Sequence, residues 1–134
     1  MGNNLTKLTF LSIVLLVVSG AGQVYAQVGL VDSLLQAASE PMTTGEKVRT
    51  YNLIAAGLRR TDRYRAAEMA EKAMTLAIGS DDRRGQADAL TIKGQLSEDS
   101  DSFAEALNLY HQALDIYIEL DSETDIANLH SLAG

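Results

Sequence analysis

From residue 27 onward, apolar residues recur at steps of three and four positions, which is the spacing of one face of an α-helix. Strand signals are absent, because no Asn-Gly or Asp-Gly pair occurs, β-branched residues are sparse, and Ala, Leu and Glu dominate. We therefore expect an all-α chain. The clearest pattern lies between residues 102 and 120, with apolar positions at Phe103, Ala106, Leu107, Tyr110, Ala113, Leu114 and Tyr117.

Capping residues and chain breakers divide this pattern into separate helices. Thr43 with Glu46 has the spacing of a capping box, and Ser102 with Glu105 has it again. Pro41 ends a short first helix, because a proline disfavours helical backbone at the residue before it. The predicted helices are 30–38, 43–60, 62–78, 82–96, 102–120 and 122–134.

The chain is similar to itself at a lag of 40 residues. Identical pairs include Ala66/Ala106, Ala73/Ala113, Asp81/Asp121, Ala87/Ala127 and Gly94/Gly134. Apolar pairs such as Met74/Leu114 keep the buried faces in register. A period of this length predicts helical hairpins that stack side by side, because a single hairpin is too thin to bury its own apolar face.

Small and aromatic residues recur at fixed places within each hairpin. The second unit carries Leu90 and Gly94 on its first helix and Phe103, Ala106, Tyr110 and Ala113 on its second. These spacings resemble the tetratricopeptide repeat (TPR) in a variant of about 40 residues. The resemblance implies a right-handed solenoid of antiparallel hairpins, with Ala and Gly where helices cross closely and aromatic rings in the space between hairpins.

The other two units match this pattern less completely. The first unit has Gly57, Ala66 and Ala73, but its glycine and first alanine are three residues closer together than Gly94 and Ala106. A third unit begins at residue 121 and reaches Gly134, the equivalent of Gly94. We therefore expect repeats at 45–80, 81–120 and 121–134, preceded by an N-terminal helix and linker at 27–44.

Residues 1–26 have the features of a secretory signal peptide. Lys7 is followed by an apolar stretch at 8–18, and the small residues Val24 and Ala26 occupy the two positions that a signal peptidase reads. The stretch is shorter than the roughly 20 residues of a membrane-spanning helix, which favours cleavage after Ala26 over an uncleaved anchor. Residues 1–6 also fit the loose N-myristoylation pattern. We expect an exported, periplasmic or extracytoplasmic protein with no membrane span in its mature segment.

Composition removes several classes of function. With no cysteine and one proline, the chain is neither a disulfide scaffold, nor collagen, nor a cysteine-ligated metal protein. Its net charge of −7 disfavours nucleic acid as a partner. His111 and His130 have no metal-binding spacing, and no nucleophile elbow or phosphate loop is present. We expect no metal, no cofactor and no catalytic residue.

Charge is unevenly distributed along the chain. All ten cations that follow the leader lie between residues 47 and 93, whereas 94–134 holds nine carboxylates and no Lys or Arg. We expect an electrically polarised array. Arginines around the first turn suit a carboxylate or an acidic partner strand, and the alternative is a solvated loop that balances Asp62 and Glu68. This basic cluster is Arg59, Arg60, Arg63 and Arg65.

In arrays of this type the first helix of each hairpin lines the concave groove. Because Leu90 and Gly94 face inward, helical geometry predicts Asp88, Thr91 and Gln95 on the concave side. The equivalent positions in the preceding hairpin are Tyr51, Ile54 and Leu58. We expect these six residues to bind a protein or peptide segment. For Ile54 and Leu58 the alternative is a cover formed by the helix at 30–35.

The whole arrangement resembles the exported N-terminal sensor region of bacterial signalling proteins. That resemblance implies a non-catalytic sensing or docking part, which a membrane helix connects to a histidine kinase, cyclase or DNA-binding output. The last unit lacks its second helix, so we expect a fragment, with any enzyme beyond residue 134. The alternative is a free-standing envelope assembly adaptor made of TPR repeats, whose last helix is covered by a partner or by self-association.

Overall fold

The computed structural model describes residues 23–37, 39 and 41–134. The expected leader lies outside these residues as far as residue 22. Within the described ranges the regular structure is entirely α-helical, with no strand, which confirms the all-α prediction. The helices are α2 (Gln23–Ala37), α3 (Thr44–Leu58), α4 (Arg63–Gly79), α5 (Arg83–Glu98), α6 (Phe103–Glu119) and α7 (Glu123–Ala133).

The five helices from α3 to α7 begin and end within two residues of their predicted bounds. The exception is α2, which begins at Gln23 rather than near residue 30. Gly29 lies inside this helix and does not end it, and the helix also extends past the expected cleavage point after Ala26. Local chain breakers and caps therefore predict the bounds of α3 to α7 better than the start of α2.

The two predicted capping boxes have different outcomes. At the start of α3, the Thr43 hydroxyl accepts a hydrogen bond from the Glu46 backbone N–H at 3.3 Å, and the Glu46 carboxylate accepts one from the Thr43 N–H at 2.8 Å. The prediction for Ser102 is wrong, since its side chain makes no capping bond. At α4 and α5 the caps are aspartates, Asp62 and Asp82, which accept from backbone N–H groups three residues later.

The same turn ends three successive helices at intervals of 20 residues. Asp81, Asp101 and Asp121 have φ angles of 55°, 60° and 53°, in the left-handed region. The residue after each aspartate donates its N–H to the carbonyl five positions earlier, as in a Schellman motif. These bonds are Asp82 to Ala77 at 2.8 Å, Ser102 to Ser97 at 2.9 Å and Ser122 to Tyr117 at 3.0 Å.

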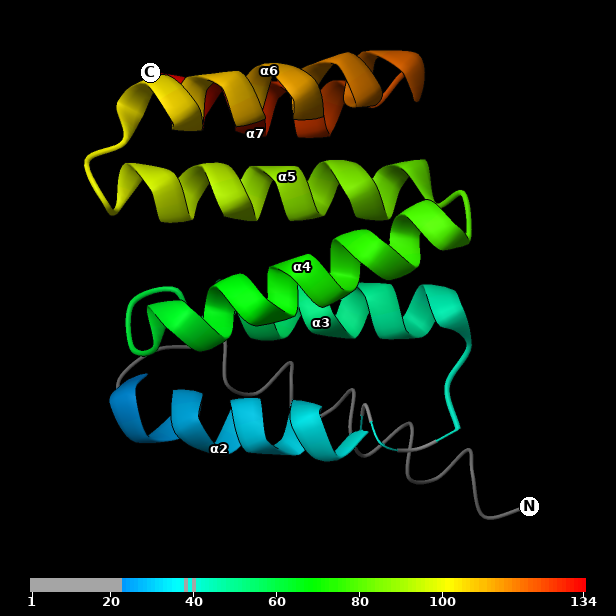
Figure 1. The fold of residues 1–134 in the computed structure, drawn as a ribbon, viewed down its shortest axis with the longest axis vertical. Helices are drawn as coiled ribbons and strands as arrows, with labels where there is room; N and C mark the ends of the chain where they lie inside the picture. Colours follow the sequence, from blue (N-terminus) through cyan, green and yellow to red (C-terminus); the bar gives the residue numbers. More distant parts are fainter. Residues whose placement is uncertain (1–22, 38, 40) are drawn as a thin grey trace.

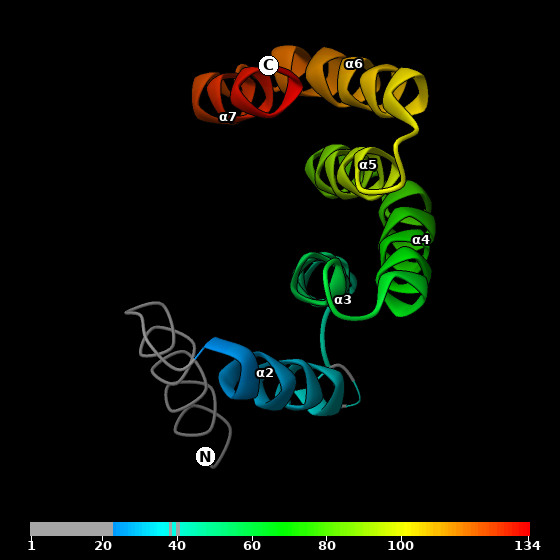
Figure 2. The same cartoon turned by 90° about the vertical axis from the view of Figure 1, so that its left-hand side faces the viewer.

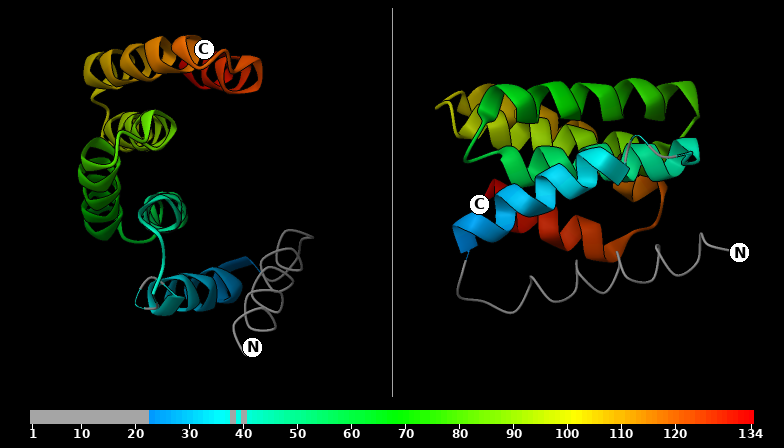
Figure 3. Two further views of the ribbon diagram at one scale, coloured as in Figure 1. Left: turned by 90° about the vertical axis from the view of Figure 1, so that its right-hand side faces the viewer. Right: turned by 90° about the horizontal axis from the view of Figure 1, so that it is seen from below.

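The helices stack into an arc. Figure 1 shows them lying roughly side by side from α2 at one end to α6 and α7 at the other. Seen end-on, the arc is open on one side, with α3 and α5 on its inner side and α4 on its outer side (Figure 2). Each helix packs against the next along the chain, and α3 also packs against α5. Both views in Figure 3 place α2 against α3 at one end of the stack.

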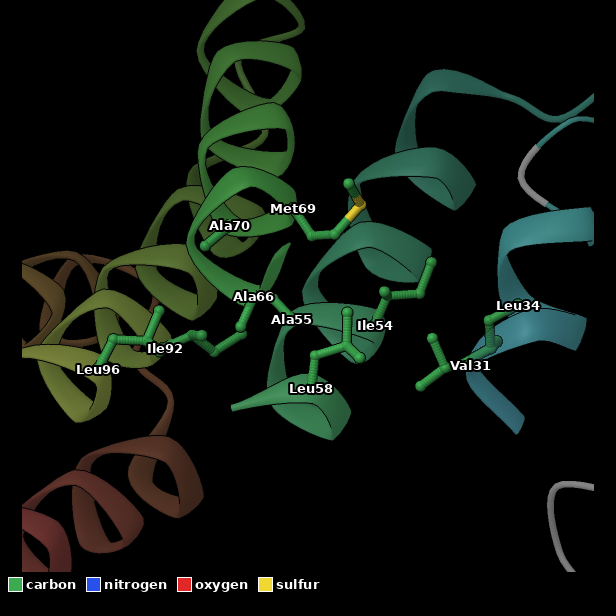
Figure 4. Close-up of a cluster of buried hydrophobic side chains, with 10 residues drawn as sticks. All are labelled: Val31, Leu34, Ile54, Ala55, Leu58, Ala66, Met69, Ala70, Ile92 and Leu96. Carbon is green, nitrogen blue, oxygen red and sulfur yellow. The ribbon is translucent and has the colours of Figure 1, made fainter. Parts of the chain in front are cut away.

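Two apolar clusters hold the stack together, and α5 belongs to both. The first joins α2, α3, α4 and α5 (Figure 4): Val31, Leu34, Ile54, Ala55, Leu58, Ala66, Met69, Ala70, Ile92 and Leu96. The second joins α5, α6 and α7: Ala87, Leu90, Ala106, Tyr110, Ala113, Ile116, Tyr117 and Leu129. A helix that presents apolar residues on two sides therefore connects the halves of the molecule.

The expected alanine positions lie inside this core. Ala66, Ala73 and Ala113 are completely buried, and Ala106 is almost so. Gly94 lies where α5 meets α6: a Cβ built on it would be 2.5 Å from Tyr110 Cε1. The ring of Tyr110 occupies the space that a side chain at residue 94 needs, so this glycine is required by close packing.

Three other expected repeat positions differ from the prediction. At Gly57 an added Cβ would lie 3.6 Å from Val31, an ordinary contact, so nothing there requires a glycine. Gly134 follows the end of α7 and has no described atom within 4 Å of an added Cβ. The prediction that Phe103 fills the space between hairpins is wrong, because its side chain is 62% exposed.

Candidate binding surface

A row of polar residues follows one face of α5. Asp88, Thr91 and Gln95 are spaced three and four residues apart, so they share one face of the helix. All three side chains are half-buried, in contrast to their fully buried neighbours Ala87 and Ala89. Tyr51 of α3 is also half-buried. The structure therefore keeps four of the six expected groove residues accessible.

Asp88 and Thr91 are joined by a residue of the next helix, Tyr117. The Tyr117 hydroxyl donates a hydrogen bond to Asp88 Oδ1 at 2.7 Å and lies 3.5 Å from Thr91 Oγ1. Thr91 Oγ1 also donates to the backbone carbonyl of Ala87 at 2.9 Å. We name Asp88, Thr91 and Tyr117 the α5 polar cluster. Its hydrogen bonds fix the orientation of the Asp88 carboxylate.

Burial governs the acid–base properties of this cluster. It raises the pKa of Asp88 above its usual value, and the hydrogen bond from Tyr117 and the charge of Arg84 only partly oppose that effect. Burial, together with the Asp88 carboxylate, raises the pKa of the Tyr117 phenol as well. Tyr117 therefore remains a neutral hydrogen-bond donor.

In the sequence, Tyr117 is recognisable only as one of the apolar positions of its helix. Its side chain is 4% exposed, and its ring does belong to the core. The polar role of its hydroxyl depends on a contact with a residue 29 positions away. No local signal in the sequence points to that contact.

Ile54 and Leu58 are not available on the inner face. They are 0% and 6% exposed, and Val31 and Leu34 of α2 pack into the same cluster (Figure 4). Their expected role as groove residues is wrong, and the alternative of a cover formed by the first helix is confirmed. The physical reason is that the apolar face of α2 packs against the apolar face of α3, so both faces are removed from water.

Two arginines of the basic cluster are bound within the chain, and the other two are exposed. Arg59 forms an ion pair with Asp99 at 2.8 Å, and Arg63 donates to the Asp99 carbonyl at 3.2 Å and to Ser100 Oγ at 3.1 Å. These arginines bind the next turn of their own chain, which neither of the sequence-based alternatives anticipated. Arg60 and Arg65 are exposed and make no ion pair within the described part of the chain.

Two further ion pairs flank the α5 polar cluster. Arg83 pairs with Glu119 at 2.6 Å, and Arg84 pairs with Asp125 at 2.6 Å. Asp125 also accepts a hydrogen bond from the Ser122 hydroxyl. Cations at the start of α5 are thus matched by carboxylates of α6 and α7, so part of the expected charge polarisation is neutralised inside the fold.

The described residues contain no group of three or more His, Asp or Glu side chains arranged to hold a metal ion. No helix among them is both long enough and apolar enough to cross a membrane. His111 and His130 instead border a hollow of about 60 Å³ between α6 and α7. Sites for drug-sized ligands measure roughly 300 to 1,000 Å³, so this hollow is too small to hold such a molecule.

In comparisons with known proteins, the chain matches no family model, no curated protein and no solved structure. The candidate surface therefore rests on the geometry of this chain. Its members are Tyr51, Asp88, Thr91 and Gln95, with Tyr117 behind them. An extended row of polar groups suits an extended ligand better than a compact one.

Proposed function

We propose that this chain is a non-catalytic helical-repeat scaffold that binds a peptide or protein segment along the inner side of α3 and α5. The observation that carries the proposal is the row Asp88, Thr91 and Gln95. These polar side chains remain partly exposed on a helix that contributes residues to both apolar clusters. Polar groups held in place on a rigid helix are suited to recognition.

We propose in addition that the helices form a TPR-like solenoid. Three observations support this: the identical turns at 20-residue intervals, the 40-residue self-similarity, and the packing of α3 against α5. In such an array α3–α4 and α5–α6 are successive hairpins, and α7 begins a third. The inner helices then form a continuous surface along which an extended segment can lie.

The chemistry of the row defines what it recognises. The carboxylate of Asp88 accepts hydrogen bonds from backbone N–H groups or from a cationic side chain. The amide of Gln95 both donates and accepts, so it pairs with a peptide bond, and the ring of Tyr51 offers an apolar surface with a polar end. Tyr117 holds the Asp88 carboxylate in a fixed orientation, which reduces the entropy lost on binding.

The leader pattern and the resemblance to bacterial sensor regions support a location outside the cytoplasmic membrane. We propose that the chain is the sensing or docking part of a larger signal-transduction protein. Its role there is to convert occupancy of the inner face into a change at the ends of the stack. Any catalytic output belongs to a different part of that protein.

The proposal is tested by selecting binding peptides from a library of random 12-residue sequences displayed on phage, with the 134-residue chain immobilised. Selected peptides are then titrated against the unchanged chain and against Asp88→Asn and Gln95→Ala. We expect each substitution to weaken binding at least tenfold, because Asp88→Asn removes the negative charge that pairs with a cationic group and Gln95→Ala removes the amide that pairs with a peptide bond. Gln112→Ala, at an exposed position of α6, is the matched control and should leave binding unchanged.

Two results contradict the proposal. One is a library that yields no binding peptide at all. The other is a set of peptides whose affinity is the same for the two α5 variants, for the control and for the unchanged chain. Circular dichroism of each variant verifies that its helices are intact.

A further inference from the structure

One face of α6 carries apolar residues that the described helices leave exposed or cover only in part. Phe103, Leu107 and Ile118 are 62%, 48% and 57% exposed, and Leu114 is half-buried. Their spacing of four, seven and four residues puts them on one face of the helix. We name Phe103, Leu107, Leu114 and Ile118 the α6 stripe. Exposed apolar residues that form one continuous face mark a site of interaction.

The equivalent face of α4 is less apolar than the α6 stripe. Forty residues earlier, the positions of Phe103 and Leu107 hold Arg63 and Ala67. Arg63 makes hydrogen bonds to the turn around Asp99. The start of this face of α4 is therefore polar and engaged within the chain, whereas Ile78, the equivalent of Ile118, is 62% exposed.

A polar bridge seen between α4 and α5 is also missing between α6 and α7. Lys93 of α5 pairs with Glu71 of α4 at 2.9 Å. The residues 40 positions later are Ala133 and His111, which border the hollow between α6 and α7 together with Leu107, Leu114 and Leu129. The surface between α6 and α7 is thus apolar and concave, whereas an ion pair bridges the equivalent surface between α4 and α5.

Charge indicates what covers this surface. Residues 94–134 hold nine carboxylates and no Lys or Arg. Asp101, Asp115 and Glu123 are exposed and form no ion pair in the described ranges. Asp101 lies two residues before Phe103, Asp115 lies beside Leu114 in sequence, and Glu123 begins α7. An apolar stripe with carboxylates at both ends and along its edge complements an apolar helix face with cations beside it.

The same charges disfavour a second copy of this chain. A symmetric pair of α6 stripes would bring two acidic ends together with no cation at either. A head-to-tail pair would need a free helix that is both apolar and basic. The cation-bearing helices α3, α4 and α5 bury most of their apolar residues in the core. Those left exposed are single side chains, Leu53 of α3 and Tyr64 and Ile78 of α4, and Glu68 and Glu71 lie between the last two along the helix.

We propose that the α6 stripe binds a cationic amphipathic helix of a partner protein, with leucine-like side chains in the hollow and Lys or Arg against the acidic rim. This site is separate from the inner face of α3 and α5 and does not depend on it. The binding is of the helix-in-groove type, in which anchors at positions i, i+4 and i+7 supply the affinity. Its electrostatic part is screened by salt.

The test uses two labelled synthetic 18-residue helices with leucines at the spacing of the α6 stripe. One carries Lys at the remaining charged positions and the other carries Glu. Fluorescence anisotropy titrations against the 134-residue chain should show that the Lys peptide binds at least tenfold more tightly than the Glu peptide. Its dissociation constant should rise several-fold between 50 mM and 500 mM NaCl.

Substitutions locate the site. Leu107→Gln and Ile118→Gln should each weaken binding of the Lys peptide at least fivefold, since both residues are exposed and their replacement leaves the fold intact. Leu53→Gln, at an exposed leucine of α3, is the control and should bind as the unchanged chain does. Far-ultraviolet circular dichroism verifies the helical content of all three variants.

Three results overturn the proposal. One is equal binding of the Lys and Glu peptides, or no binding of either. Another is equal affinity of Leu107→Gln and Leu53→Gln for the Lys peptide. The third is a sedimentation velocity profile in which the chain alone is a dimer that Leu107→Gln dissociates, because a second copy then occupies the stripe.

Discussion

At the scale of single residues, two glycines on corresponding helices have different importance. Gly94 faces the ring of Tyr110, which is itself 4% exposed and whose hydroxyl donates to Glu98 at 2.9 Å. The ring is held on both sides and cannot move away from an added methyl group. Gly57 has only an ordinary contact at 3.6 Å with Val31. Position in the repeat therefore does not by itself determine which glycine is essential.

We predict that Gly94→Ala lowers the free energy of unfolding by about 1 to 2 kcal/mol, because overpacking outweighs the gain in helix propensity. Gly57→Ala is the matched control and should be neutral or raise that free energy by up to about 1 kcal/mol. Urea denaturation followed by circular dichroism measures both. Equal values for the two variants would show that Tyr110 is not packed against residue 94.

Asp88 gives a prediction for pH dependence. Its pKa in the folded chain is raised by burial, so the folded state holds this proton more tightly than the unfolded state does. The contribution of Asp88 to stability is therefore present at acidic pH, below the usual carboxyl pKa, and is lost as the pH rises through the raised value. Asn at this position carries no such charge.

Asp88→Asn should consequently gain stability relative to the unchanged chain as the pH rises from about 3.5 to 7. Urea midpoints of the two proteins, measured across this pH interval, test the sign. A difference in midpoint that stays constant, or that changes in the opposite direction, would mean that Asp88 is not buried as described.

At the scale of elements, the three identical turns fix the lengths of α4, α5 and α6. Each places an aspartate in the left-handed region, where L residues other than Asn and Asp carry a conformational strain of about 1 to 2 kcal/mol. Asp101 is fully exposed at the α5–α6 turn. It offers a position at which backbone conformation can be tested without changing the core.

Asp101→Gly should be more stable than Asp101→Ala by about 1 kcal/mol, because glycine adopts a positive φ without strain. Thermal and urea denaturation of the two variants measure the difference. If Asp101→Ala were as stable as Asp101→Gly, residue 101 would not be in the left-handed conformation in solution.

The sequence predicted where each helix begins and ends better than it predicted which helices pack against each other. Bounds of α3 to α7 follow from local signals such as Thr43, Asp62 and Asp82, which act within three residues. The apolar period of α6 shows that Phe103 and Ala106 belong to apolar positions, but it does not show that only Ala106 is covered. Whether an apolar residue is buried depends on which helix packs against it, and that is decided only by the folded chain.

The candidate site shows the same limit. Asp88, Thr91 and Gln95 were predictable because they share a helix face with each other. The burial of Ile54 by α2 and the bond from Tyr117 to Asp88 depend on contacts between distant segments. Sequence analysis recognised the first of these only as an alternative and did not recognise the second.

At the scale of the whole molecule, ion pairs connect successive units of the stack. Arg59 and Asp99 are 40 residues apart, so the pair joins equivalent turns of neighbouring units. Their side chains are 19% and 34% exposed, less than the 49% and 58% of Lys72 and Glu68 within α4. The pair between units is thus better shielded from solvent than the pair within one helix.

A double-mutant cycle with Arg59→Ala and Asp99→Ala should give a coupling free energy of about 0.5 to 1 kcal/mol, reduced by more than half in 1 M NaCl. The same cycle on Lys72 and Glu68 provides the reference, for which a smaller coupling free energy is expected because both side chains are more exposed to solvent. A coupling for the first pair that is no larger than the reference would argue against a contact between the two turns.

The central claim is that a peptide lies along the inner side of α3 and α5. Its most direct test is amide hydrogen exchange of the 134-residue chain, measured by mass spectrometry with and without a peptide selected on the chain. The account predicts slower exchange in α5 around Asp88 to Gln95 and in α3 around Tyr51, with no change on the outer helix α4. Protection confined to α4, or spread evenly over all the helices, would contradict it.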